Sequence, residues 1–322
     1  MDCMIVSVVT GGAGFIGSHL TTRLAEGGHQ VRVLDCLAGS AARTRAARLA
    51  ALPGVEVITG DIRDAALCRS ALAGADFVFH HAAEVSVPQS IQDPASCIAV
   101  NLGGLVNLLE AARSAQTVKR FVLASSCAVY GDTPGAAKSE ASPTNPLSPY
   151  ASSKLGGEYL CRNYFALHGL QTVCLRYFNV YGPDQDPNGA YAAVIPKFIS
   201  ALLNGERPII YGDGEQTRDF VFVGDVGEAN LQAAFAGQDA AGQSLNIGSG
   251  RSVSLNQILA ALSQMLGREV EVDRRAARAG DIRASGADIT LAQKLLDFSP
   301  SVALEGGLAR TLHWYQSERV QN

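Results

Sequence analysis

Long hydrophobic runs are missing from this chain of 322 residues. The apolar stretch that begins at Met4 is ended by glycines at Gly11, which makes it too short for a signal peptide or a membrane span. Charged residues make up only 17%, and the formal net charge of −4 argues against a general nucleic-acid binder, because phosphate backbones need clustered cations. The basic run Arg274, Arg275 and Arg278 is local and indicates a small anionic ligand or a solvated surface. We expect a cytoplasmic protein with no membrane or nucleic-acid partner.

Paired cysteines are missing as well. The cysteines are odd in number, scattered, and without Cys-x-x-Cys spacing: Cys3, Cys36, Cys68, Cys97, Cys127, Cys161 and Cys174. This distribution argues against a disulfide framework and against a zinc site, so no metal is expected. It predicts reduced, mostly buried thiols in a cytosolic protein.

Short apolar runs alternate with helical patterns through the first half of the chain. The predicted buried strands are 4–9, 30–34, 55–59, 76–80, 121–124 and 172–176. The predicted helices are 16–25, 42–52, 65–71, 95–115 and 150–168. Nearly continuous apolar strands separated by helices indicate a parallel sheet covered on both faces. Right-handed crossovers make this a doubly wound α/β fold of the Rossmann type.

The pattern is less regular after residue 177. A stretch rich in Pro, Gly, Asn and Asp predicts an ordered loop over 179–189. Helices are expected at 195–203, 224–236 and 254–266, strands at 208–211 and 244–247, and a turn at 212–216. We predict a first domain over 1–177 and a smaller mixed α/β substrate-binding lobe over 178–322, with the chain re-entering the first domain over about 219–248.

A glycine-rich turn from Thr10 to Gly17 follows the first predicted strand and opens a helix. Gly11 permits a tight turn, Gly14 lets the backbone approach a diphosphate, and Gly17 lets the helix pack closely. The free N–H groups and the positive dipole end of that helix attract the anion. Asp35 ends the second strand, where a carboxylate binds adenosine ribose hydroxyls and repels a 2′-phosphate. The pattern therefore predicts NAD rather than NADP.

A strand ending in Ser125 and Ser126 precedes a helix that opens with Tyr150 and Lys154. The four-residue spacing places the tyrosine and the lysine on one helical face. A free phenol has a pKa of about 10, too high for a base at neutral pH. We expect the nearby ammonium, together with the positive nicotinamide of NAD, to favour the phenolate. Ser126 is the favoured hydrogen-bond partner of the reacting oxygen, and Ser125 is the alternative, because the sequence does not fix which serine points inward.

Together these residues resemble the extended short-chain dehydrogenase/reductase family, along nearly the whole chain. The motifs that carry the resemblance are Gly11 to Gly17, His81-Ala82-Ala83, Ser125-Ser126 with Val129-Tyr130-Gly131, Tyr150 to Lys154, Arg176 to Pro183, and Gly212-Asp213-Gly214 with Arg218-Asp219-Phe220. Within that family the chain is most similar to UDP-hexose 4-epimerases. The stretch 185–196 resembles the branch that acts on N-acetylated UDP-sugars.

The resemblance implies a site for NAD. Asp61, at the end of the third predicted strand, is a candidate for the adenine amine and equally for capping the following helix. The implied cofactor residues are Gly11, Gly14, Phe15, Ile16, Gly17, Asp35, Asp61, Ile62, Ala82, Ala83, Asn101, Tyr150, Lys154 and Tyr177.

A UDP-sugar site is implied as well. Arg218 and Arg278 are assigned to the pyrophosphate, because planar guanidinium forks suit diphosphates, although two surface arginines are the alternative. Epimerases restricted to unacetylated sugars resemble each other in a bulky tyrosine where this chain has Ser285, which leaves room for an N-acetyl group. Ser86 is a candidate sugar contact or a loop cap. The implied substrate residues are Ser86, Ser126, Asn179, Ala193, Val194, Ile195, Tyr211, Arg218, Arg278, Asp281 and Ser285.

The activity implied is NAD-dependent 4-epimerisation through a 4-keto sugar, on UDP-GlcNAc and UDP-GalNAc as well as or instead of UDP-Glc and UDP-Gal. Tyr150 removes the sugar 4-OH proton, the C4 hydride passes to the nicotinamide, and Ser126 bonds the same oxygen. Lys154 holds the nicotinamide ribose. Helices 95–115 and 150–168 carry apolar faces beyond what one sheet face requires, and with the resemblance they imply a homodimer through a four-helix bundle.

Two other functions are left open. A 4,6-dehydratase or a decarboxylase has the same fold, but dehydratases place Asp-Glu where Cys127 and Ala128 stand, and the decarboxylase pattern expects a glutamate nearby. A non-catalytic protein that senses NAD or nucleotides commonly loses the tyrosine or the lysine, and this chain keeps both. Further departures from close relatives stand at Cys36, Gln89 and Ala284.

Overall fold

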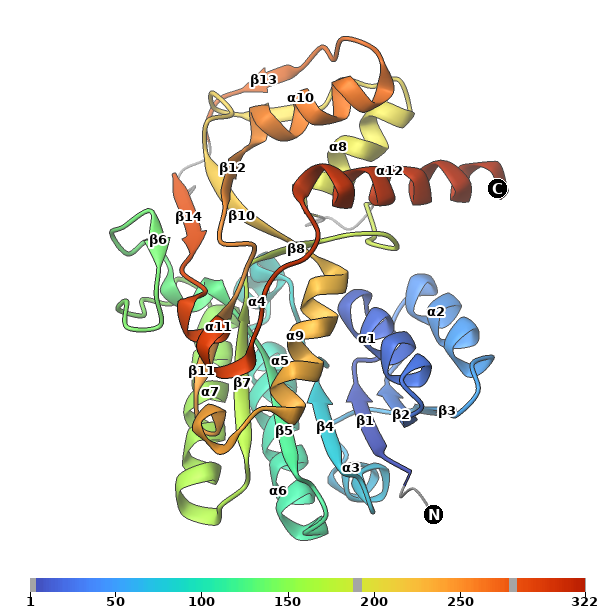
Figure 1. The fold of residues 1–322 in the computed structure, drawn as a ribbon, viewed down its shortest axis with the longest axis vertical. Coiled ribbons are helices and arrows are strands. Elements are labelled where there is room, and N and C mark those ends of the chain that lie inside the picture. The colour runs from blue at the N-terminus through green and yellow to red at the C-terminus, as the bar shows by residue number, and fades with distance from the viewer. Residues whose placement is uncertain (1–3, 188–192, 278–282, 322) are drawn as a thin grey trace.

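The larger part of the chain is built on one sheet of seven parallel strands (Figure 1). The computed structural model describes residues 4–187, 193–277 and 283–321. The strand order is β11-β7-β5-β4-β1-β2-β3. These strands are β1 (Val6–Thr10), β2 (Gln30–Asp35), β3 (Val55–Thr59), β4 (Phe77–His80), β5 (Arg120–Ser126), β7 (Thr172–Tyr177) and β11 (Ser244–Ile247). The chain crosses from β3 to β4 on the far side of β1, which confirms the predicted doubly wound fold.

Helices cover both faces of this sheet because its strands are apolar on both sides. Val9 and Val122 belong to one core cluster, and their neighbours Val8 and Phe121 belong to the other. The first cluster receives α1 (Phe15–Glu26), α2 (Ser40–Ala50), α9 (Val223–Phe235) and α11 (Thr290–Leu296). The second receives α3 (Ala65–Leu72), α6 (Leu105–Ala115) and α7 (Pro149–His168). Successive strand residues point to opposite faces, so one strand contributes to both clusters.

The helix predicted over 95–115 is one apolar stretch with an irregular centre. It follows α4 (Val87–Gln92) and comprises α5 (Pro94–Ile98), a π-helical turn over Ala99–Gly104, and α6. Gly104 lies against Ile62, where an added Cβ would be 2.4 Å from the Ile62 Cδ1 atom. The stretch Pro94–Ala115 is long and apolar enough to cross a membrane by length and composition alone. In the fold its buried side packs into the second core cluster.

A smaller lobe stands at the carboxyl end of the large sheet, in the upper part of Figure 1. Its mixed sheet comprises β6 (Ala137–Lys138), β8 (Asn179–Tyr181), β10 (Thr217–Phe222), β12 (Ser252–Ser254) and β14 (Ala284–Ala287), and β9 (Ile209–Tyr211) pairs separately with β13 (Asp273–Arg275). Three helices share its apolar core: α8 (Val194–Leu203), α10 (Leu255–Leu266) and α12 (Leu304–Gln321).

The prediction of a loop over 179–189 is wrong for its first three residues. Residues Asn179–Tyr181 form β8, which pairs in parallel with Phe220–Phe222 of β10. Three residues are too few to show a strand periodicity, and the pairing partner lies far along the chain. The boundary between the two predicted domains stays a prediction, although β11 of the expected re-entrant segment pairs with β7 in the large sheet.

Candidate active site

A cleft of about 810 Å³ lies at the carboxyl ends of the large sheet's strands. Its walls include residues at the ends of β1, β2, β3, β4, β5 and β7, where open α/β sheets bind ligands. Most of the predicted cofactor residues and all three predicted catalytic residues line it: Gly11, Gly14, Phe15, Ile16, Gly17, Asp35, Asp61, Ile62, Ala82, Ala83, Ser126, Tyr150, Lys154 and Tyr177.

The glycine turn fits a bound diphosphate. Gly11 has a φ of +65°, and an added Cβ there would lie 2.5 Å from the backbone nitrogen of Ala82. An added Cβ on Gly17 would lie 2.2 Å from the Gly11 carbonyl oxygen, so the turn closes only with glycine at both positions. Within the described part of the chain no side chain caps α1 at Gly14, and its first turn carries no acid. The N–H groups at this helix end are therefore suited to an anion.

Two carboxylates stand along the adenosine side of the cleft. Asp35 accepts hydrogen bonds from the backbone nitrogens of Ala13 at 3.0 Å and Leu37 at 2.8 Å, which fixes its side chain beside the glycine turn. Asp61 is paired with Arg63 at 2.6 Å, and this guanidinium holds the pKa of the carboxyl below its usual range. The alternative role of Asp61 as a helix cap is wrong, because Asp64 caps α3.

Ser126, Tyr150 and Lys154 meet where β5 ends beside the start of α7. The Ser126 hydroxyl forms a hydrogen bond with the Tyr150 phenol. Lys154 is buried, its Nζ lies 5.9 Å from the centre of the Tyr150 ring, and it donates a hydrogen bond to the Ala124 carbonyl oxygen at 2.8 Å. Pro149 and the capping hydroxyl of Ser148 start α7 here. The spacing of four residues then puts both functional side chains on the face toward the cleft.

Burial controls the titration of this pair. It raises the pKa of Tyr150 to about 12, although the hydrogen bond with Ser126 lowers it, and it lowers the pKa of Lys154 to about 8. The cost of burying a phenolate therefore dominates the pKa of Tyr150 in this structure. The expected joint effect of the ammonium and the nicotinamide ring stays a prediction.

The choice between the two serines is made by their neighbours. Ser125 is buried and its hydroxyl donates to Glu158, which also forms a buried ion pair with Arg176 at 2.6 Å. Arg176 in turn donates to the Tyr130 hydroxyl at 2.8 Å. The Ser125 hydroxyl is thus committed to a polar network behind the cleft, and Ser126 is the serine that faces the tyrosine.

Two predicted residues support the cleft wall from outside it. Asn101 is buried, donates to the Glu84 carbonyl oxygen at 3.0 Å and to Ser153 at 2.9 Å, and accepts from the Glu84 nitrogen at 2.8 Å. These bonds occupy its amide and hold the loop at Glu84, and a contact of Asn101 with the cofactor stays a prediction. Ser86 caps α4 by accepting from the Gln89 nitrogen at 3.1 Å, which is the second of the two roles considered for it.

Apart from Ser86 and Ser126, the predicted substrate residues that the structure describes lie in the smaller lobe. Arg218 on β10 is the register partner of Ser285 on β14, which brings together two residues far apart in the sequence. Asn179 lies between Phe178 and Val180, which both line the cleft, and its side chain donates to the Asp219 carbonyl oxygen at 3.0 Å. Of the remaining positions, Ala193 is the N-cap of α8, Val194 and Ile195 begin that helix, and Tyr211 ends β9. Arg278 and Asp281 lie outside the described residues.

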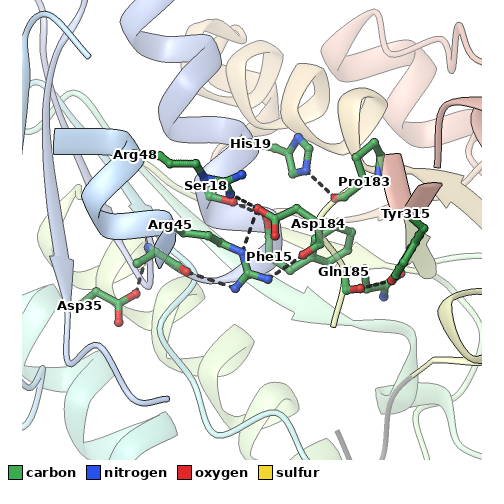
Figure 2. A network of polar contacts seen from close by, with 11 residues as sticks. Phe15, Ser18, His19, Asp35, Arg45, Arg48, Pro183, Asp184, Gln185 and Tyr315 are labelled. Carbon is green, nitrogen blue, oxygen red and sulfur yellow. Dashed lines mark hydrogen bonds and ion pairs between the residues drawn. The ribbon is translucent and has the colours of Figure 1, made fainter. Parts of the chain in front are cut away.

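Residues outside the predicted cofactor and substrate sets also reach the cleft. Arg45 of α2 and Asp186 line it, and Figure 2 shows Arg45 between Asp35 and Asp184. His81 lines it too, and burial lowers the pKa of its imidazole to about 3, so the ring is neutral. A cation on a helix has no local signature, and only the packing of α2 against the segment after β8 reveals Arg45.

Comparisons with known proteins give the family. The model of the NAD dependent epimerase/dehydratase family matches residues 7–248. The UDP-glucose 4-epimerase of Mycolicibacterium smegmatis is 40% identical over 314 residues, covering 97% of this chain and 99% of that protein. The dTDP-glucose 4,6-dehydratase of Streptomyces niveus is 35% identical over 320 residues, covering 97% of this chain and 93% of that protein.

A solved structure is also similar over almost the whole chain. It is the UDP-N-acetylglucosamine 4-epimerase from Methanobrevibacter ruminantium M1 in complex with UDP-N-acetylmuramic acid, with a TM-score of 0.92 and 38% identity, covering 99% of this chain and 100% of that one. Similarity of this extent, together with a glycine turn that fits a dinucleotide, fixes the broad chemistry. The chain is an enzyme of the NAD-dependent epimerase/dehydratase family, whose relatives here act on nucleotide sugars.

Proposed function

We propose that this enzyme inverts C4 of a UDP-hexose and that it accepts N-acetylated UDP-sugars. The observation that carries the proposal is the meeting of Ser126, Tyr150 and Lys154 at the cleft edge, with Cys127 and Ala128 directly after the serine. A phenol, a hydroxyl and a lysine suffice to move one proton to and from a sugar oxygen, whereas a dehydratase also needs an acid to eliminate water.

The chain's residues divide the work as follows. Tyr150 takes the proton of the sugar 4-OH and later returns it, while Ser126 donates a hydrogen bond to the same oxygen and keeps it in line with the phenol. Bound NAD would supply the hydride acceptor and donor at C4, held by the glycine turn, Asp35 and Lys154. Because the hydride removed from C4 would be returned to the same carbon, no net oxidation occurs, and its return to the opposite face of the 4-keto sugar inverts C4.

The smaller lobe supports a diphosphate-linked sugar as substrate. Arg218 offers a guanidinium suited to the pyrophosphate, and Ser285 stands beside it in the register of β10 and β14. Ser285 is small and half-buried, which leaves room for an N-acetyl group at C2. The backbone over Ala193–Ile195 begins α8, where no side chain of the described residues provides a cap, and it is proposed to hold the nucleotide.

We also propose a cytoplasmic homodimer. Apolar side chains stay exposed on neighbouring helices, namely Ile98 of α5, Val106 of α6, and Tyr159 and Leu167 of α7. An apolar face of this kind fits the same face of a second copy better than it fits water.

The direct test is to incubate the purified enzyme separately with UDP-GlcNAc and UDP-Glc and to analyse the products. We expect UDP-GalNAc and UDP-Gal, with the mass of the sugar unchanged and no net NADH. A product lighter by one water would instead identify a dehydratase. Failure to convert UDP-GlcNAc, with NAD bound and the fold intact, would remove the N-acetyl assignment.

Replacing the phenol tests the site. Tyr150→Phe is expected to lower kcat by about a thousandfold, because the proton acceptor is lost, while NAD content and thermal stability are kept. The matched control is Tyr159→Phe on the exposed side of the same helix, which should keep wild-type turnover. A Tyr150→Phe enzyme with undiminished turnover would show that the base lies elsewhere.

A further inference from the structure

Asp184 is held by two arginines of α2. Its carboxylate pairs with Arg45, with the Nε and Oδ2 atoms 3.1 Å apart, and with Arg48. Its carbonyl oxygen accepts a hydrogen bond from Arg45 Nη2 at 2.6 Å. The Arg45 side chain is 7% exposed and that of Asp184 is 18% exposed. One buried guanidinium therefore fixes both the backbone and the side chain of this aspartate.

The same guanidinium reaches the glycine turn. Arg45 Nη1 lies 3.4 Å from the Ala13 carbonyl oxygen, and the Ala13 nitrogen donates to Asp35 at 3.0 Å. Figure 2 shows these contacts as a row that runs from Asp35 through Arg45 to Asp184. The carboxylate proposed to bind the adenosine ribose is thus joined through three contacts to a segment that follows β8.

The segment around Asp184 is fixed at several other points. The His19 ring nitrogen Nε2 lies 2.9 Å from the Pro183 carbonyl oxygen, and Tyr315 of α12 donates to the Gln185 carbonyl oxygen. Asp184 itself has a φ of +66°, a backbone conformation that is uncommon in residues other than glycine, asparagine and aspartate. Arg45 and Arg48 hold this residue by its carboxylate and Arg45 also by its carbonyl oxygen, so their removal should loosen the segment at Asp184.

This segment reaches the cleft at Asp186 and precedes the proposed nucleotide site in the sequence. Asp186 and Arg45 both line the cleft that contains the glycine turn, and the chain continues to Ala193 at the start of α8. We propose that Arg45 is a positioning residue. Through its contacts with Asp184 it couples the glycine turn to the segment after β8 that precedes the proposed nucleotide site. Each ligand then strengthens the binding of the other, because linkage between two sites is reciprocal. This inference rests on the proposed function.

The test measures coupling rather than turnover. The rate of NAD release from the NAD-loaded enzyme is followed with and without saturating UDP, and the affinity for UDP is measured by calorimetry. In the wild type UDP should slow NAD release by about tenfold. The release ratio, defined as the rate without UDP divided by the rate with UDP, should fall close to one in Asp184→Asn and in Arg45→Met. Asparagine tolerates positive φ, so the first variant removes charge without adding backbone strain. The double variant should match the single ones, because both changes break the same link.

The matched control is Arg43→Met, an exposed arginine of the same helix that does not contact Asp184. It should keep the wild-type ratio. Thermal unfolding is measured on every variant, and if Arg45→Met does not fold, Asp184→Asn and Arg48→Met decide the question. The inference is overturned if the wild-type enzyme binds NAD and UDP without mutual effect, or if the variants keep the wild-type ratio. Either outcome would leave the proposed function standing. A wild type that binds no UDP would overturn the proposed substrate as well.

Discussion

Two adjacent serines at the end of β5 have opposite surroundings, and this gives a sharp prediction at the residue scale. Ser126→Ala should lower kcat by about a hundredfold, because the reacting oxygen loses a hydrogen-bond donor. Ser125→Ala should instead lower the free energy of unfolding by about 1–3 kcal/mol, because Glu158 loses a buried donor. Steady-state kinetics and urea denaturation of both variants check this. A larger loss of kcat in Ser125→Ala would exchange the two roles.

Tyr150, the proposed base, shows how far a residue's neighbours decide its chemistry. The spacing of Tyr150 and Lys154 placed the two on one helical face, and the structure has them there. Their pKa values, about 12 for the phenol and about 8 for the ammonium, follow from burial. The spacing of two residues in the sequence does not predict how deeply they are buried. We predict that the depression of the phenol's pKa that a base requires comes with the positively charged nicotinamide ring.

At the scale of elements, the end of β4 carries two neutral histidines. His80 is buried and its Nδ1 lies 2.7 Å from the Thr10 hydroxyl oxygen. Burial, and then the charge of Lys154, hold the pKa of His80 well below its usual value and that of His81 at about 3. The unfolded chain binds protons there at a pKa of about 6.5. The contribution of these neutral histidines to the free energy of unfolding is therefore present above that pH. It is lost as the pH falls below it, because the unfolded state binds more protons.

The corresponding prediction concerns how steeply the free energy of unfolding depends on pH. Between about pH 7 and pH 5 the free energy of unfolding should fall, by at most about 1.4 kcal/mol per pH unit for each histidine. His80→Gln should flatten this slope, whatever its effect on stability at neutral pH. The exposed His313 of α12 provides the control, since His313→Gln should keep the wild-type slope. Urea denaturation across this range measures it, and equal slopes in all three proteins would contradict the assignment.

At the scale of the whole molecule, the exposed apolar face on α5, α6 and α7 predicts self-association. Val106→Glu should shift the enzyme toward monomer, because a carboxylate buried between two copies loses its hydration. Ile209→Glu is the control, since Ile209 of β9 is similarly exposed, at 39% against 37%, but lies in the smaller lobe. Light scattering coupled to gel filtration measures the mass. A wild-type monomer at all concentrations would refute the dimer.

The sequence by itself determined the features that arise from neighbours along the chain. The glycine turn, the acid that ends β2, and the tyrosine and lysine one helical turn apart are local patterns, and the alternation of apolar strands with helices fixes the doubly wound sheet. These follow from backbone sterics and side-chain period alone.

Only the tertiary structure decided which side chains meet across long stretches of chain. It placed Ser126 beside Tyr150 and Ser125 beside Glu158, made Asn179–Tyr181 a strand, and placed Arg45 against Asp184. The physical reason is common to all three. Burial and pairing energies depend on what packs beside a residue, and that is set by how whole elements dock rather than by the residues next to it in sequence.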